Sequence, residues 1–215
     1  AGAPEPGSRL GLRVRLAACM CARTRLIGLR GDLPWPSLAP DLARLRGLLQ
    51  GGAGVLGRVS FEESLMTHPD GLPCSPLVVL TREPPPRLEA HLRRQLHSRM
   101  FAAPSLQEAL ARLRAERAPA SGSRPLDVWI LGGTEVYREA LPLAATLSLT
   151  VIVDGFNASA AGAGEPDARA TYFPEEWEDY FALSCGTSPP TPRFDLHSGL
   201  TYEFREYITK GKASA

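Results

Sequence analysis

Short apolar runs alternate along the chain with amphipathic stretches. Runs rich in Val, Ile and Leu that end at Gly, Pro or polar clusters are typical of buried strands, whereas apolar residues spaced three or four apart indicate helices. On this basis strands are predicted at 14–20, 55–57, 77–81, 100–103, 127–131, 146–154, 179–185 and 201–209. Helices are predicted at 38–49, 58–65, 106–113 and 134–141.

This order of elements predicts the fold class. Strands that alternate with helices and then end in a strand pair indicate an α/β fold with a mixed, mostly parallel central sheet, about eight strands flanked by about four helices. At 215 residues the chain is expected to form a single domain. The expected parts are a flexible N-terminal arm at 1–12, the folded domain at 13–209 and a disordered tail at 210–215. The acid-poor arm also fits the remainder of a transit peptide.

The first predicted helix carries one acid on its apolar face. Ser37 is its expected N-cap, and Pro40 suits its first turn. The apolar stripe consists of Leu38, Leu42, Leu45, Leu48 and Leu49. Asp41 lies on this stripe, three residues after Leu38 and four before Leu45. Because an unpaired charge buried among apolar groups costs several kcal/mol, we expect Asp41 to have a partner or a ligand.

Charge and cysteine content narrow the class of protein. A net charge of +1 provides no field that would recruit nucleic acid or an anionic membrane, and no apolar run is long enough for a membrane span. We therefore expect neither partner. The four cysteines, Cys19, Cys21, Cys74 and Cys185, lack zinc-site spacing, so reduced thiols and no metal are expected. Reduced thiols favour the cytoplasm, with the mitochondrion as the alternative.

Three strand ends carry residues that suit phosphate groups. Two strands end in glycine where a helix begins, at 57–60 and at 132–135, and free N–H groups at a helix start favour an anion. Thr81 and Arg82 close a third strand. Taken singly, the two junctions also fit tight turns, and the third also fits a solvated strand end. The G-x-G-x-x-G match at 52–57 follows a helix, so it does not predict a Rossmann fingerprint.

Several segments taken together resemble one enzyme family. They read IGLRGDLPWPSLAPD, LGRVSFEES, VVLTRE, VWILGGTEVYREAL, LSLT and YFPE, and they span about residues 14 to 209. This set, in this order, is similar to the dihydrofolate reductase family. The resemblance implies the fold of that family, reduction of 7,8-dihydrofolate to tetrahydrofolate, and NADPH as the hydride donor.

The resemblance also implies a pterin site around Asp41. The Asp41 carboxylate would accept two N–H bonds from the pteridine, Thr150 would hydrogen-bond to Asp41, and Trp35 would order a water nearby. The 29–35 loop would close over the substrate, and a water admitted beside Leu33 would protonate N5. The other implied substrate-binding residues are Ala18, Leu45, Leu131 and Tyr137.

For the cofactor, the resemblance implies a nicotinamide flanked by Met20 and Ile27. The implied diphosphate-binding residues are Gly57, Arg58, Val59, Ser60, Gly132, Gly133, Thr134, Glu135 and Val136. Thr81 and Arg82, together with Arg58, would bind the 2′-phosphate and favour NADPH over NADH. The Gly132–Gly133 peptide would match a cis Gly-Gly peptide of the family.

Three positions depart from the family pattern. Ser75 stands where the family has an arginine for the folate carboxylate, Leu45 replaces an aromatic residue, and Met20 replaces a small one. Arg46, on the Asp41 helix, is the predicted substitute for that arginine. Two alternatives remain: a weak or inactive homologue that serves as a structural or assembly subunit, with or without bound NADPH, and a reductase of another pterin or pyrimidine. The protein is accordingly expected to be a monomer or a subunit of a larger assembly.

Overall fold

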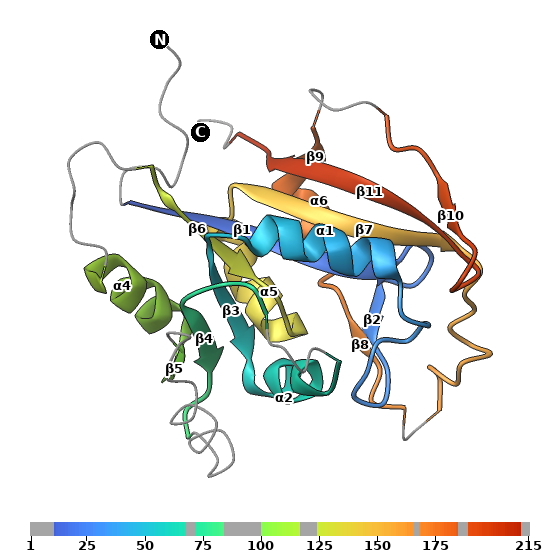
Figure 1. Cartoon of the computed structure of the whole chain (residues 1–215), viewed down its shortest axis with the longest axis horizontal. Coiled ribbons are helices and arrows are strands. Elements are labelled where there is room, and N and C mark those ends of the chain that lie inside the picture. Colours follow the sequence, from blue (N-terminus) through green and yellow to red (C-terminus); the bar gives the residue numbers. More distant parts are fainter. Residues whose placement is uncertain are drawn as a thin grey trace.

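The chain folds around a nine-stranded sheet (Figure 1). The computed structural model describes residues 11–67, 72–83, 100–116, 124–165, 168–184 and 189–211. The strands of this sheet are β1 (Leu12–Cys21), β3 (Ala53–Gly57), β4 (Leu77–Leu80), β5 (Met100–Ala103), β6 (Leu126–Ile130), β7 (Thr146–Asp154), β9 (Phe181–Leu183), β10 (Arg193–Asp195) and β11 (Leu200–Thr209). A second sheet pairs β2 (Leu26–Gly28) with β8 (Thr171–Tyr172). The helices are α1 (Ala39–Leu49), α2 (Arg58–Thr67), α4 (Leu106–Glu116), α5 (Thr134–Ala140), a 3₁₀ turn (Leu141–Leu143) and α6 (Trp177–Tyr180).

The large sheet is mixed and mostly parallel, as predicted. Its order is β10-β11-β7-β1-β6-β3-β4-β5, and β9 pairs with the other half of β11. The six strands from β7 to β5 run parallel to one another, whereas β11 is antiparallel to β7. Helices on both faces bury the parallel strands, which explains why all residues of β7 from Leu147 to Ile152 are buried.

Two pairs of helices cover the two faces of the sheet. Leu49 of α1 and Phe61 of α2 pack with Trp129 on one face. Residues of α4 and α5 pack with alternate residues of β1, such as Leu16, on the other face. In Figure 1, α1 accordingly lies across β1 and β7, in front of the sheet. None of the described helices is both long and apolar enough to span a lipid bilayer.

The predicted elements appear with two local corrections. The N-cap of α1 is Leu38, not Ser37, because Leu38 is buried against the Trp35 cluster and the chain enters the helix one residue later. The start of the predicted strand at 179–185 is instead the short helix α6, because Trp177 packs edge-on against Tyr207 and turns the chain there. Ser105 caps α4, since the Glu108 N–H donates to Ser105 Oγ at 3.2 Å.

The boundaries of the folded region can be compared with the predicted ones in part. Leu12, which was predicted to belong to the arm, already pairs with Leu126 in the sheet. The last paired residue of β11 is Thr209, where the predicted domain ends. Residues 1–10 of the arm, 212–215 of the tail and Cys185 lie outside the described residues.

Candidate active site

A cleft of about 1240 Å³ opens where the carboxyl ends of β3, β4 and β6 meet one face of α1. These three strands are neighbours in the parallel part of the sheet, so their carboxyl ends lie at one edge. In open α/β sheets this edge is where ligands bind. Segment 170–175 and the turn before Leu33 close the cleft from the other side.

Helix α1 lines the cleft with the face that carries its acid. The lining residues of this helix are Asp41, Leu42, Arg44, Leu45 and Leu48. The leucines of the predicted stripe therefore divide: Leu38 and Leu49 are buried in the core, whereas Leu42, Leu45 and Leu48 are half-buried along the cleft. Arg46 is exposed and does not line the cleft, because it lies about 140° around the helix from Asp41.

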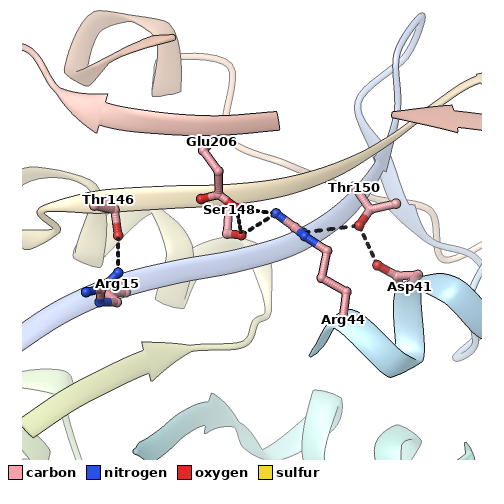
Figure 2. A network of polar contacts seen from close by, with 7 residues as sticks. All are labelled: Arg15, Asp41, Arg44, Thr146, Ser148, Thr150 and Glu206. Atoms are coloured by element: carbon pink, nitrogen blue, oxygen red, sulfur yellow. Dashed lines mark hydrogen bonds and ion pairs between the residues drawn. The ribbon is translucent and has the colours of Figure 1, made fainter. Parts of the chain in front are cut away.

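The Asp41 carboxylate has a buried partner. Thr150 Oγ1 donates a hydrogen bond to Asp41 Oδ1 at 2.5 Å, and the Thr150 side chain is completely buried in β7 (Figure 2). The predicted contact between these two residues is thus present. Leu33 lines the cleft at its mouth and is 37% exposed. Trp35 is buried with its ring edge-on to Phe156 and does not line the cleft.

Two further polar side chains lie close to Asp41 and are neutral near pH 7. Burial, followed by the charge of Asp41, raises the pKa of the Cys19 thiol well above its usual range. Burial is also the main cause that raises the pKa of Tyr137, with smaller contributions from Cys19 and Asp41. The Tyr137 hydroxyl donates to the backbone oxygen of Ala17 at 2.8 Å. Cys19 and Tyr137 both line the cleft. Because both are neutral near pH 7, neither contributes charge to it.

The sequence had not singled out Arg44, Ser148 and Glu206, which form a polar cluster beside Asp41. Arg44 Nη2 donates to Ser148 Oγ at 2.6 Å and forms an ion pair with Glu206 (Figure 2). The Arg44 guanidinium also lies 4.6 Å from the ring centre of Phe204. The only sequence signal was spacing, because Arg44 follows Asp41 by three residues and so shares its helix face. Its partners could not be identified without the fold.

Of the two residues that the resemblance implies beside the nicotinamide, one lines the cleft and the other does not. Ile27 in β2 lines the cleft together with Ala18 and Leu131. Met20 does not line it, and instead packs in the core cluster that contains Leu16 and Val151. Ala18, two residues earlier in β1, lines the cleft, whereas Met20 is only 5% exposed and does not.

The glycine-containing strand ends meet directly. The Gly57 N–H donates to Gly132 O at 2.7 Å, and the Gly132–Gly133 peptide is cis, as the resemblance implied. Gly132 has a φ of +127°, and a Cβ there would lie 3.3 Å from Ser60 Oγ. Only glycine allows this backbone and this close approach. All nine predicted residues of these two segments line the cleft.

The third predicted phosphate position also lines the cleft. Thr81 and Arg82 follow β4, and the Thr81 hydroxyl donates to the backbone oxygen of Glu83 at 2.9 Å. Arg58 lies nearby on α2 but pairs with Glu62 at 2.9 Å. Within the described parts of the chain, Arg82 is the cleft arginine that has no acidic partner.

The loop expected to act as a lid is tied to the 157–170 segment. Leu29 and Asp32 exchange backbone hydrogen bonds across a tight turn in which Arg30 and Gly31 have positive φ. The Arg30 N–H donates to Ala168 O at 2.9 Å, and the Arg30 side chain forms an ion pair with Glu165. The ion pair is at exposed positions, so it can open without loss of the core.

Comparison with known proteins identifies the family to which this chain is similar. The dihydrofolate reductase family model matches residues 16–180. The dihydrofolate reductase of Aedes albopictus is 28% identical in an alignment of 204 positions that covers 89% of this chain and 95% of that protein. That of Mycobacterium tuberculosis is 30% identical over 163 residues, which are 76% of this chain and 86% of that protein.

A solved structure supports the same conclusion for the fold. The dihydrofolate reductase from Enterococcus faecalis complexed with NADP(H) and RAB-propyl superimposes with a TM-score of 0.64 and 21% identity, over 94% of this chain and 98% of that chain. The predicted fold is therefore confirmed. With the family match over residues 16–180 and the cleft described above, we conclude that this chain belongs to the dihydrofolate reductase family.

Proposed function

We propose that this protein reduces 7,8-dihydrofolate to tetrahydrofolate with NADPH. One observation carries the proposal: a carboxylate fixed by a buried threonine shares a cleft with two glycine strand ends that suit a dinucleotide. Substrate and cofactor would thus meet in one enclosed space, which hydride transfer requires. The relatives at about 30% identity support this activity.

Asp41 would bind the pterin edge that carries the ring N3–H and the 2-amino group. A carboxylate accepts two parallel N–H bonds from such an edge, and the hydrogen bond from Thr150 to Oδ1 holds this carboxylate in place. Leu45 would pack on the ring, while Ala18 and Leu131 would offer backbone carbonyls. Tyr137, neutral and fixed to Ala17, would close this side without adding a charge.

The two glycine-containing strand ends, at 57–60 and 132–136, suit the diphosphate of NADPH. Helix α2 has no acidic residue in its first turn, so its free N–H groups favour an anion. A larger residue at Gly132 or Gly133 would crowd Ser60, which keeps this edge open. Thr81 and Arg82 would bind the 2′-phosphate, and Ile27 would flank the nicotinamide. When bound, NADPH supplies the hydride.

The residues of the chain would then orient the substrate and control its protonation. Asp41 would bind the pterin edge far from N5, so it would position the ring rather than donate a proton to N5. Leu33, exposed at the mouth of the cleft, would admit the water that protonates N5. The 29–35 loop, linked to 168 through Arg30, would then exclude further water.

One observation favours the alternative of a weakly active homologue. Ser75 is exposed and does not line the cleft, and the cleft arginines near Asp41 that the structure describes already pair with acids. A charged glutamyl tail would then gain little from an arginine on this side. Such a protein would reduce folate poorly or would retain only nucleotide binding.

Turnover assays separate these functions. Oxidation of NADPH by the full-length chain with dihydrofolate should be measurable at 340 nm, and Asp41→Asn should reduce kcat/KM by about 100-fold or more, since the anionic acceptor is lost. Dihydrobiopterin, which lacks the glutamyl tail, serves as the second substrate. No turnover of either substrate, together with retained NADPH binding by calorimetry, would refute the reductase proposal.

A further inference from the structure

Arg44 occupies an unusual place for a cation. It projects from the same face of α1 as Asp41, lines the cleft, and has a side chain that is only 16% exposed. A charge this buried is costly unless it is paired and hydrogen-bonded. Glu206 of β11 supplies the counter-charge, and Ser148 of β7 supplies a hydroxyl that accepts from Arg44 and donates to Glu206 at 2.7 Å.

The cluster continues from Arg44 to the acid of the site. Arg44 Nη1 lies 3.5 Å from Thr150 Oγ1, the hydroxyl that donates to Asp41 at 2.5 Å (Figure 2). Because Arg44 can only donate, the Thr150 hydroxyl accepts from that side and its proton is left for Asp41. The guanidinium therefore lies within about 6 Å of the Asp41 carboxylate, a range in which opposite charges still interact strongly.

We infer that Arg44 is a positioning residue of the site: acting through Thr150, it orients the hydroxyl toward Asp41 and stabilises the ionised, acceptor-only form of that carboxylate. Glu206 and Ser148 hold Arg44 in place, and Glu206 partly cancels its charge. The inference rests on the proposed function for its catalytic consequence, since the ionised form is the one that accepts the pterin N–H groups.

Arg44 places a positive charge near Asp41, and the groups that face Asp41 from β1, α5, β7 and β11 and are described below are neutral or negative. Cys19 of β1 and Tyr137 of α5 both have a raised pKa and stay neutral where a carboxyl group titrates. Thr150 of β7 carries no charge. Glu206 of β11 is negative and lies behind Arg44. Both Asp41 and Arg44 act on the Cys19 thiol, in opposite directions, which places both charges beside the same atom.

Direct titration of Asp41 tests the inference without substrate or cofactor. The full chain is labelled with carboxyl-¹³C aspartate, the Asp41 signal is assigned with Asp41→Asn, and its titration midpoint is followed by NMR. Arg44→Met should raise the midpoint by about one pH unit, since a favourable cation is lost. Glu206→Gln should lower it by roughly half a pH unit, since an anion that cancels Arg44 is lost.

Two variants serve as controls. Arg44→Lys keeps the charge and should leave the midpoint within about 0.3 of wild type. Arg112→Met removes an arginine that likewise pairs with a glutamate and lies over an aromatic ring, but on α4 away from the site, and should not move the midpoint. A merely structural role for Arg44 would not produce shifts of opposite sign in Arg44→Met and Glu206→Gln.

The outcomes separate this inference from the proposed function. An unchanged midpoint in Arg44→Met, or shifts of the same sign in Arg44→Met and Glu206→Gln, overturns the inference. If Arg44→Met does not fold, the downward shift in Glu206→Gln and the wild-type midpoint in Arg44→Lys decide it. Where wild type turns over dihydrofolate, the acid limb of its kcat/KM profile should move with each midpoint. Where it does not, the reductase proposal fails while the titration still decides the role of Arg44.

Discussion

The hydrogen bond from Thr150 to Asp41 can be removed with almost no change of shape. Valine replaces the Thr150 hydroxyl by a methyl group, so Thr150→Val leaves no cavity in the buried centre of β7 but deprives the carboxylate of its donor at 2.5 Å. A hydrogen bond to a charged group contributes about 1.5–3 kcal/mol. Thr150→Val also removes the acceptor for Arg44, but that contact is longer, at 3.5 Å, so the lost bond to Asp41 should dominate the change in stability.

We therefore expect Thr150→Val to lower the free energy of unfolding by about 1.5–3 kcal/mol at pH 7. For a chain of this size the melting temperature should fall by roughly 3–12 °C. Urea unfolding followed by tryptophan fluorescence measures the loss, and the m-value should stay unchanged because the surface exposed on unfolding is the same.

Thr146→Val on the same strand is the matched control. The Thr146 hydroxyl accepts a long hydrogen bond of 3.4 Å from Arg15, and no acid depends on it (Figure 2). Its loss should cost less than about 1 kcal/mol. If Thr150→Val costs no more than Thr146→Val, the Asp41 carboxylate is not held by this hydroxyl and the reasoning about the site fails.

Two further variants test other parts of the cleft, and a third tests a buried thiol of the core. Gly132→Ala forces a side chain into a backbone with φ +127° and places it 3.3 Å from Ser60 Oγ, so NADPH affinity measured by calorimetry should fall about 10-fold or more. Unaltered affinity would show that these glycine strand ends do not bind NADPH. Arg82→Ala should weaken NADPH binding by about 10-fold and leave NADH binding unchanged, because only NADPH carries the 2′-phosphate; equal losses for both nucleotides would contradict this assignment. Burial raises the pKa of the Cys74 thiol to about 12. The folded chain therefore favours the protonated thiol, and this contribution to stability is complete below pH 9 and is lost as the pH rises toward 12. In urea titrations, the difference in the free energy of unfolding between wild type and Cys74→Ala should shrink by about 2 kcal/mol from pH 9 to pH 11. A pH-independent difference would show that this thiol ionises equally in the folded and unfolded chains.

Local patterns were sufficient for the elements that carry the fold. The apolar and β-branched residues of β7 and the spaced leucines of α4 specify strand and helix through local composition and spacing, and both elements were predicted close to their observed bounds. Strands β2, β8 and β10 were not predicted, because two or three residues have no periodicity and adopt strand geometry only through their partners. Helix α6 belongs to the same class, since it depends on the packing of Trp177.

The candidate site divides in the same way. The sequence by itself determined Asp41 on an apolar helix face and the glycines at two strand ends, because each is a matter of residue type and short spacing. Only the tertiary structure decided that Arg44 faces Ser148 and Glu206, which lie 104 and 162 residues further along the chain, and that Arg46 faces solvent. Such pairs depend on strand order and register, which bring distant positions together and which no local pattern encodes. The acid was therefore evident from the sequence, whereas the cation and the anion behind it became evident only when β7 and β11 were placed beside α1.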